Sequence, residues 1–283
     1  MALKDKVVVV TGAGRGMGAC YVRGFLAEGA KIVALDYVWG STGVSYDKDE
    51  SYTEEIRSRN DVLIVTADIT SNAQVRAAYE AAMKRFGTVD VLVNNAGLLQ
   101  RSLFPPGRPV TTLEATVADF EKSYAVNVFG TLRVTQAFIH PMIEKRSGSI
   151  ITVVSSGLLM SSNSGAWVAR RPWTKEQPYM SAKAALANMM FYLAEEVREH
   201  NVAVNLIIPG HTRSTGFDEW ADAQVAHGRT RGSATVRTDH VVPVALFLAQ
   251  QDAQSGNTGK AFDALVWNLE HGHGSPEIWS RPT

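Results

Sequence analysis

The sequence is poor in cysteine. Of its 283 residues one is a cysteine, Cys20. A single cysteine cannot form an internal disulfide, and no Cys/His spacing typical of a zinc site is present. We interpret Cys20 as a packing residue rather than a redox group, because free cysteines are commonly buried in cores. His271 and His273 stand two residues apart without a supporting cluster of ligands, so we expect no bound metal.

Long apolar runs and an excess of charge of either sign are also missing. No stretch of about 20 apolar residues is present, which argues against a membrane-spanning helix. The apolar run that follows MALKDK is too short for the core of a signal peptide. The 28 Lys and Arg residues balance 28 Asp and Glu residues, so no global charge attracts nucleic acid or an anionic membrane. We therefore expect a cytoplasmic protein that binds neither nucleic acid nor membrane.

What the sequence does have is a regular alternation of apolar runs and helical patterns. Hydrophobic residues make up 45% of the chain and charged residues 20%, which leaves ample material for a core. The runs are rich in Val and Ile and apolar on consecutive residues, as in strands buried on both faces of a parallel sheet. Strands are predicted at residues 7–10, 32–35, 62–65, 89–93, 150–154 and 202–208, and helices at about 16–28, 71–86, 113–145, 179–200 and 238–249. This alternation predicts a doubly wound α/β fold, with one domain spanning residues 1–283.

A glycine-rich segment, TGAGRGMG at residues 11–18, follows the first predicted strand and opens the first predicted helix. Glycines let the backbone turn tightly and approach a pyrophosphate without a Cβ in the way. The helix N-terminus then presents N–H groups and the positive end of a dipole to the phosphates. A glycine-rich turn alone is a weak signal, but the strand before it and the helix after it favour dinucleotide binding over a generic turn.

Asp36 ends the second predicted strand, 18 residues after Gly18. A carboxylate at this position accepts hydrogen bonds from the adenosine ribose hydroxyls and repels a 2′-phosphate, which favours NAD over NADP. Arg15 complicates this prediction. Its guanidinium could receive a 2′-phosphate, pair with Asp36 or simply be solvated, so NADP stays an alternative.

Four motifs together identify a family resemblance. TGAGRGMG at 11–18, NNAG at 94–97, YMSAK at 179–183 and the Pro-Gly pair at 209–210 occur in the order and spacing of the short-chain dehydrogenase/reductase family, from residue 5 to about 265. The resemblance implies a Rossmann-type sheet of about seven parallel strands, a nicotinamide cofactor and a homotetramer. It also implies roles for individual positions.

The cofactor-binding positions implied by the resemblance are Gly12, Arg15, Gly16, Met17, Gly18, Asp36, Asp68, Ile69, Asn95, Ala96, Gly97, Tyr179, Lys183, Pro209, Gly210, Thr212 and Ser214. Asp68 matches an acid that meets the adenine, although it could equally cap the helix that begins near Ser71. Ile69 could equally be a core residue. Asn94, Ala96 and Gly97 match the loop that lines the adenosine ribose and stabilises the central sheet. Ser214 stands where the family commonly has threonine, and its hydroxyl preserves the chemistry.

The catalytic prediction rests on Tyr179 and Lys183, which lie one helical turn apart on the same face. A free phenol has a pKa of about 10 and is a poor base. A nearby ammonium and a positive nicotinamide ring both favour the phenolate, so the tyrosine can exchange a proton with an alcohol or ketone oxygen. By resemblance, Ser156 hydrogen-bonds the substrate oxygen, and Asn127 holds a water in a proton relay behind the lysine.

The predicted function is therefore an NAD-dependent oxidoreductase that interconverts a secondary alcohol and a ketone. Its substrate would be a small molecule. Two alternatives remain: an NADP-dependent carbonyl or ketoacyl-thioester reductase, and a non-catalytic nucleotide-binding protein, since fold does not guarantee function.

Three segments depart from the family pattern. Ser156 and Tyr179 are 23 residues apart, against about a dozen in the family, so residues 161–178 are interpreted as an insertion beside the active site. Its Trp167 and Trp173 could wall the pocket, and its two arginines, Arg170 and Arg171, could bind an anionic group or be solvated. Residues 211–236 are predicted to be a substrate lid. Residues 266–283 are predicted to form a C-terminal arm that packs on a neighbouring subunit.

Overall fold

The protein is described by a computed structural model that covers residues 2–39, 50–104, 110–155, 177–210, 212, 225–226 and 236–280. Seven strands form one sheet with the order β3-β2-β1-β4-β5-β6-β7, and every neighbouring pair is parallel. The strands are β1 Val7–Thr11, β2 Lys31–Asp36, β3 Val62–Thr66, β4 Val91–Asn94, β5 Gly148–Val153, β6 Val202–Ile208 and β7 Lys260–Asp263. The predicted Rossmann-type fold with about seven parallel strands is confirmed.

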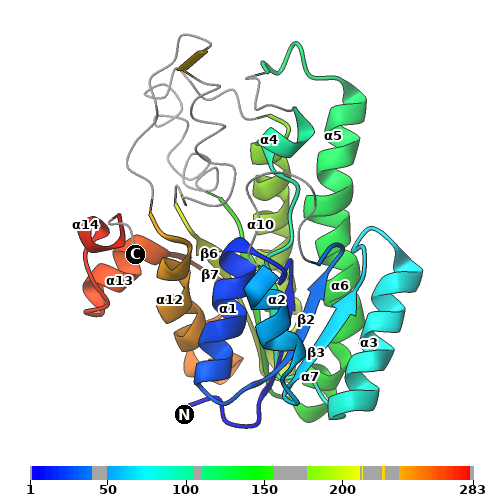
Figure 1. Cartoon of the computed structure of the whole chain (residues 1–283), viewed down its shortest axis with the longest axis vertical. Helices are drawn as coiled ribbons and strands as arrows, with labels where there is room; N and C mark the ends of the chain where they lie inside the picture. Colours follow the sequence, from blue (N-terminus) through cyan, green and yellow to red (C-terminus); the bar gives the residue numbers. More distant parts are fainter. Residues whose placement is uncertain are drawn as a thin grey trace.

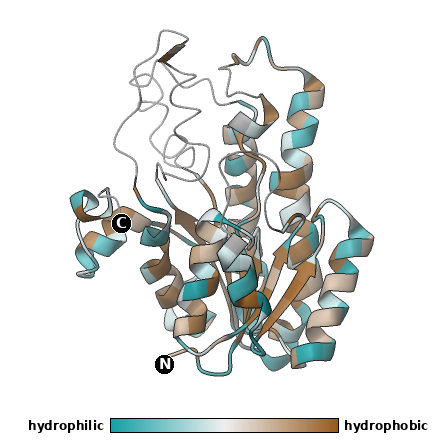
Figure 2. Cartoon of the chain, viewed as in Figure 1, coloured by the Kyte–Doolittle hydropathy of each residue, from teal (hydrophilic) through white to brown (hydrophobic). Residues whose placement is uncertain are grey.

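Helices cover both faces of this sheet (Figure 1). The longer helices are α1 Gly16–Ala27, α2 Glu50–Arg57, α3 Asn72–Phe86, α5 Val117–Tyr124, α6 Thr131–Phe138, α7 His140–Lys145, α10 Tyr179–Glu196, α12 Val242–Leu248 and α13 Ala264–Glu270. The short ones are α4 Gln100–Leu103, η1 Ala125–Gly130, η2 Arg198–His200, η3 Thr238–Val241, η4 Ala253–Ser255 and α14 Pro276–Trp279. The apolar strands lie between helices whose outer faces carry most of the polar residues (Figure 2).

The alternation of side chains along β1 explains the two helical layers. Val7 and Val9 belong to the core shared with α3, α6 and α10, whereas Val8 and Val10 belong to the core shared with α1, α12 and α13. Successive side chains of a strand point to opposite faces, so a strand covered on both faces must be apolar throughout. The consecutive valines of β1 satisfy this requirement.

The long helix predicted over residues 113–145 is interrupted. It begins later, with Thr116 and Asp119 forming a capping box at the start of α5, and it changes to a π-helix over η1 before continuing as α6 and α7. π-helical segments inside α-helices often lie at functional sites. Asn127, a predicted catalytic residue, lies within η1.

Helix α2 was not predicted. Its sequence, ESYTEEIR, is mostly charged and polar, and only Tyr52 and Ile56 form an apolar stripe. Both side chains are buried, four residues apart on one face of the helix. Two apolar positions are too few to give a clear helical period in the sequence. The burial of Tyr52 and Ile56 against the rest of the protein is therefore what marks this segment as a helix.

The predicted C-terminal arm contacts the body of its own chain, and its predicted packing on a neighbouring subunit stays a prediction. Trp267 of α13 packs against Phe247 of α12 with ring centres 5.3 Å apart, and Trp279 of α14 lies under the guanidinium of Arg237 at 5.0 Å. Both tryptophans are buried without a partner subunit. Of the predicted insertion the structure describes only residues 177–178, and of the predicted lid only 212, 225–226 and 236, so the remaining residues of both lie outside the described parts of the chain.

Candidate active site

The carboxyl edge of the sheet joins the glycine-rich turn to the loop after β4. The strand order reverses between β1 and β4, which is where doubly wound sheets bind ligands. The Thr11 hydroxyl accepts hydrogen bonds from the backbone N–H groups of Asn95 (3.0 Å) and Ala96 (3.1 Å) and donates one to the carbonyl of Val93 (3.3 Å). The Asn95 amide donates to the carbonyls of Thr11 (3.0 Å) and Gly12 (3.1 Å). The two loops therefore form one hydrogen-bonded unit.

Thr11 is absent from the predicted site residues. The sequence does carry a signal for it, because it places a hydroxyl directly after four valines and before Gly12, where the strand must end. A polar side chain at the end of an apolar strand points to a buried hydrogen-bonding role. Asn94, its neighbour across the edge, instead donates to Thr135 (3.0 Å) and Thr152 (3.3 Å), which supports the predicted structural role in the sheet.

Two glycines of the motif leave room that no other residue would. A Cβ on Gly12 would lie 2.9 Å from the Cα of Ala96, and a Cβ on Gly18 would lie 1.9 Å from the carbonyl oxygen of Gly12. Arg15, the N-cap of α1, forms no capping hydrogen bond with its side chain, and the first turn of α1 holds no acidic residue. The turn thus fits a pyrophosphate at the N-terminus of α1. Binding by Gly12, Arg15, Gly16, Met17 and Gly18 stays a prediction.

Asp36 lies at the carboxyl end of β2, against the glycine-rich turn. Its carboxylate accepts hydrogen bonds from the N–H groups of Gly14 (2.8 Å), Tyr37 (2.8 Å) and Val38 (3.3 Å). Burial raises the pKa of Asp36, while these N–H groups and the positive charge of Arg15 oppose the rise. The carboxylate is therefore held in a defined orientation beside the turn.

Asp68 and Ile69 lie just after β3. The Asp68 carboxylate accepts hydrogen bonds from the backbone N–H and the hydroxyl of Thr70, both at 2.8 Å, while Ser71 is the N-cap of α3. The capping role considered for Asp68 thus belongs to Ser71, and Asp68 braces the turn before it. Ile69 is buried, and its side chain lies 2.8 Å from where a Cβ on Gly130 would stand, so it packs against η1. Contacts of either residue with a cofactor stay predictions.

Lys183 is the most unusual charge in the structure. Its side chain is 3% exposed, and its ammonium donates a hydrogen bond of 2.9 Å to the carbonyl of Val153, at the end of β5. The ammonium lies 5.9 Å from the centre of the Tyr179 ring, one turn earlier on α10. Burial lowers the pKa of Lys183 to about 8, and no charge among the described residues offsets this. The lysine is therefore still an ammonium at neutral pH, without a carboxylate partner in the described parts of the chain.

Asn127 holds the loop after β4 against this lysine. Its side chain accepts a hydrogen bond from the N–H of Leu98 (3.1 Å) and donates to the carbonyl of Leu98 (3.0 Å) and to the hydroxyl of Ser123 (3.3 Å). Gly97 lies between Asn127 and Lys183. A Cβ on Gly97 would stand 2.8 Å from the Asn127 side-chain oxygen and 3.5 Å from the Lys183 ammonium. The structure thus brings Asn127, Gly97 and Lys183 together, as predicted from separate motifs. The water relay stays a prediction.

The turn after β6 completes the described part of the site. The carbonyl of Pro209 accepts a hydrogen bond from the hydroxyl of Thr212 (3.4 Å), and it lies 2.7 Å from the ring Nε2 of His240. The Thr212 hydroxyl also contacts the sulfur of Met17 at 3.9 Å, so this turn meets the start of α1. Gly210 follows with a φ of 65°. Ser156 and Ser214, both predicted site residues, lie outside the described residues.

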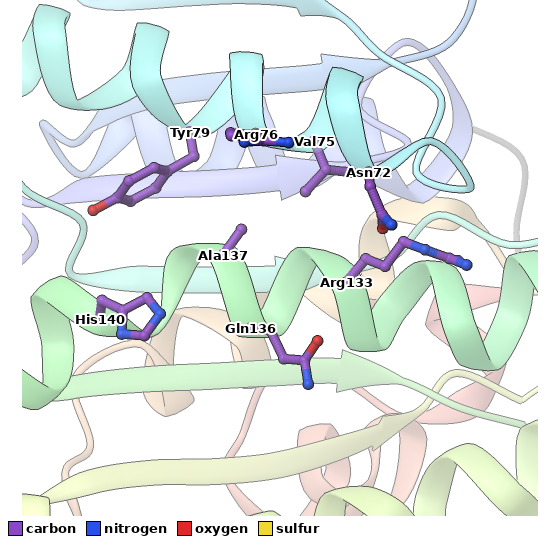
Figure 3. Close-up of a pocket in the computed structure, with 8 residues that line it drawn as sticks. All are labelled: Asn72, Val75, Arg76, Tyr79, Arg133, Gln136, Ala137 and His140. Carbon is purple, nitrogen blue, oxygen red and sulfur yellow. The ribbon is translucent and has the colours of Figure 1, made fainter.

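A cavity of about 220 Å³ lies elsewhere, between α3 and α6 (Figure 3). It is lined by Asn72, Val75, Arg76, Tyr79, Arg133, Gln136, Ala137 and His140. None of the predicted site residues lines it. The cavity is therefore separate from the predicted cofactor-binding and catalytic residues at the carboxyl edge of the sheet.

A model of one protein family, described as short chain dehydrogenase, matches residues 6–225. The chain belongs to the short-chain dehydrogenase family. It is therefore an oxidoreductase of a family that binds a nicotinamide cofactor, and the predicted resemblance is confirmed. In the parts of the dehydrogenase that the structure describes, no helix is long and apolar enough to cross a membrane, and no cluster of three or more metal-ligating side chains is found.

Among known proteins, this dehydrogenase is 43% identical to fluoren-9-ol dehydrogenase of Terrabacter sp. (strain DBF63) over 274 residues, 97% of its own chain and 74% of the relative. It is 31% identical to momilactone A synthase of Oryza sativa subsp. japonica over 261 residues, 89% of its chain and 86% of the relative. Among solved structures, it resembles 3-ketoacyl-(acyl-carrier-protein) reductase from Brucella melitensis complexed with NADH. That likeness has a TM-score of 0.70 and 27% identity over 92% of this chain and 97% of the other.

Proposed function

We propose that this short-chain dehydrogenase interconverts a secondary alcohol and a ketone with NAD, and that Tyr179 is its general acid/base. The observation that carries the proposal is the environment of Lys183: a buried ammonium, with no carboxylate partner among the described residues, 5.9 Å from the Tyr179 ring centre. A buried cation is stabilised by any negative charge that forms beside it. A phenolate on Tyr179 is such a charge, so Tyr179 releases its proton more readily than a free phenol does.

The proton path follows from this pair. In oxidation, the Tyr179 phenolate accepts the proton of the substrate hydroxyl, and in reduction the phenol donates a proton to the substrate oxygen. Ser156 is proposed to donate a hydrogen bond to the same oxygen. Asn127 keeps Gly97 and its loop against the Lys183 ammonium and supports the proposed water relay. When bound, NAD supplies the hydride acceptor, and the protein supplies orientation and electrostatics.

NAD rather than NADP is proposed because of Asp36. Three backbone N–H groups hold its carboxylate beside the glycine-rich turn, where an adenosine 2′-phosphate would meet a negative charge. Arg15 supports the second candidate, an NADP-dependent carbonyl or ketoacyl-thioester reductase, because its positive charge lies close enough to lower the pKa of Asp36. A cation there would offset the repulsion of a 2′-phosphate.

The proposed substrate class is a bulky cyclic secondary alcohol. Two observations support it: the 43% identity to a fluoren-9-ol dehydrogenase, and the two tryptophans, Trp167 and Trp173, in the segment between Ser156 and Tyr179. Aromatic side chains are common linings of pockets for apolar ligands.

By family resemblance we also propose a homotetramer, which light scattering would check.

The test compares fluoren-9-ol, acyclic secondary alcohols and ketoacyl thioesters with NAD(H) and NADP(H) by absorbance of the reduced cofactor. Tyr179→Phe should lower kcat by about 10³-fold or more, because the proton transfer is lost, while NADH binding stays within about twofold. Tyr192→Phe is the matched control, since Tyr192 lies on the same helix, is 68% exposed and should leave turnover unchanged. A fall in NADH affinity as large as the fall in kcat would mean that Tyr179 is structural. Turnover with NADPH alone would select the second candidate.

A further inference from the structure

His240 is a fully buried histidine outside the predicted site. It lies in η3, just before α12, and none of its surface is exposed. Both ring nitrogens face backbone carbonyl oxygens: Nε2 lies 2.7 Å from that of Pro209, and Nδ1 contacts that of Arg237. A neutral imidazole has one N–H donor, so it can satisfy one of these carbonyls, and the protonated ring can satisfy both.

The two carbonyls belong to different parts of the molecule. Pro209 starts the turn after β6, which touches the first turn of α1 through Thr212 and Met17. Arg237 is fixed to the C-terminal helix α14, because its N–H donates to the carbonyl of Trp279 (2.9 Å) and its guanidinium lies 5.0 Å from the ring centre of that tryptophan. The His240 ring therefore links the turn to α14.

Further contacts fix His240 itself. Its carbonyl accepts a hydrogen bond of 2.8 Å from the side chain of Asn268 on α13, and its ring centre lies 6.4 Å from that of Trp279. Burial lowers the pKa of His240, while the two carbonyls and the carboxylates of Asp239 and Asp263 favour the protonated ring. The Asp239 carboxylate is in turn paired with the Arg237 guanidinium at 3.0 Å.

We propose that His240 is a positioning residue for the nicotinamide half of the cofactor, and that the bond from Nε2 to the Pro209 carbonyl holds the Pro209-Gly210 turn in its binding geometry. The inference rests on the proposed function and on the family resemblance, which implies that this turn meets the nicotinamide. The proposal also assigns a supporting role in cofactor binding to the C-terminal segment. Helices α13 and α14 form the platform from which His240 acts on the site, so that segment supports its own active site.

The test uses two amides that each replace one ring nitrogen. In His240→Gln the side-chain amide stands where Nε2 stands and can still donate to Pro209. In His240→Asn the amide stands where Nδ1 stands and reaches only Arg237. The two ligands are NADH and ADP-ribose, which lacks the nicotinamide ring but keeps the adenine, the ribose next to it and the pyrophosphate. His271→Gln is the control, because His271 also bonds a backbone carbonyl, that of Trp267 at 2.8 Å, but has no bond to Pro209.

Calorimetric titration should give a Kd for NADH that rises about tenfold in His240→Asn, because a buried carbonyl loses its donor. The same Kd should stay within about threefold of wild type in His240→Gln. The Kd for ADP-ribose should be unchanged in all variants. Equal loss of NADH affinity in the Asn and Gln variants, or equal loss of both ligands in His240→Asn, would overturn the proposal. Wild-type protein that binds neither ligand would instead overturn the proposed function.

Discussion

A lysine at one edge of the sheet has a carboxylate partner, and a lysine at the other edge lies in a buried site without one among the described residues. At the amino edge, the ammonium of Lys145 pairs with Asp90 at 2.6 Å, and Asp90 also accepts a hydrogen bond from the N–H of Val7 (2.8 Å) and contacts Lys6 at 3.5 Å. At the carboxyl edge, Lys183 is more deeply buried, and the described residues offer it a backbone carbonyl and no carboxylate.

The two lysines differ in what they contribute: Lys145 contributes to the stability of the fold, and Lys183 is proposed to contribute to catalysis. Burial raises the pKa of Asp90, but Lys145, the Val7 N–H and Lys6 outweigh it, so the pKa of Asp90 ends below its usual value. The amino-edge charges thus stabilise each other and the fold. Burial opposes the charge of Lys183, and among the described residues its ammonium has a hydrogen bond to the Val153 carbonyl but no negative partner. Under the proposed function, Lys183 stabilises a phenolate on Tyr179, and the site carries the cost of the buried charge in its resting state.

The largest effect should separate the two lysines by activity. Lys183→Met should lower kcat by about 10³-fold, because the phenolate of Tyr179 loses its counter-charge. Lys145→Met should leave kcat within about twofold, since its partner Asp90 lies at the other edge of the sheet. Initial rates with NAD and saturating alcohol measure both. Similar losses in the two variants would remove the distinction between the edges.

The next effect should separate them by stability. Asp90→Asn should lower the free energy of unfolding by about 2 kcal/mol at neutral pH, because a partly buried, charge-assisted network is broken. Since the folded pKa of Asp90 is lowered, its stabilisation is present above the unfolded pKa and lost as pH falls through the folded one. The difference between wild type and variant should therefore shrink towards about pH 3 in urea titrations.

An exposed pair provides the control for that measurement. Asp61 pairs with Arg59 at 2.7 Å, but their side chains are 39% and 40% exposed. Asp61→Asn should cost about 0.5 kcal/mol or less, because water screens such pairs. Equal losses for Asp90→Asn and Asp61→Asn would show that the amino-edge network adds nothing beyond an ordinary surface pair.

A further effect, similar in size to that of Asp90→Asn, is a pH dependence of stability that Lys183 alone should cause. Its pKa falls from 10.5 to about 8 on folding, so the folded state binds this proton less tightly than the unfolded state does. The group's stabilisation is therefore complete above the unfolded pKa and is lost as pH falls towards about 8. Between about pH 7 and about pH 9.5, cofactor-free wild type should gain about 2 kcal/mol of unfolding free energy relative to Lys183→Met. Parallel pH profiles of the two proteins would mean that the lysine is not desolvated.

Much of the fold and site could be predicted from the sequence, and the failures have local causes. The strands were recognisable because Val and Ile runs of β1 and β6 are apolar on both faces. Helix α2 was missed because only Tyr52 and Ile56 mark its buried face. The π-helical break that contains Asn127 leaves no distinct period in the sequence, and the Asn127 side chain pairs with the backbone of Leu98, which lies 29 positions earlier in the chain.

The sequence by itself determined the parallel sheet, the glycine-rich turn and the position of Tyr179 and Lys183 on one helix. These follow from side-chain alternation, from backbone sterics at Gly12 and Gly18 and from helical spacing, which all act over a few residues. Only the tertiary structure decided that Lys145 has an acid beside it while the described residues place none beside Lys183, and that the His240 ring lies between the carbonyls of Pro209 and Arg237. Burial and charge pairing depend on residues far apart in the chain, so no local pattern in the sequence could contain them.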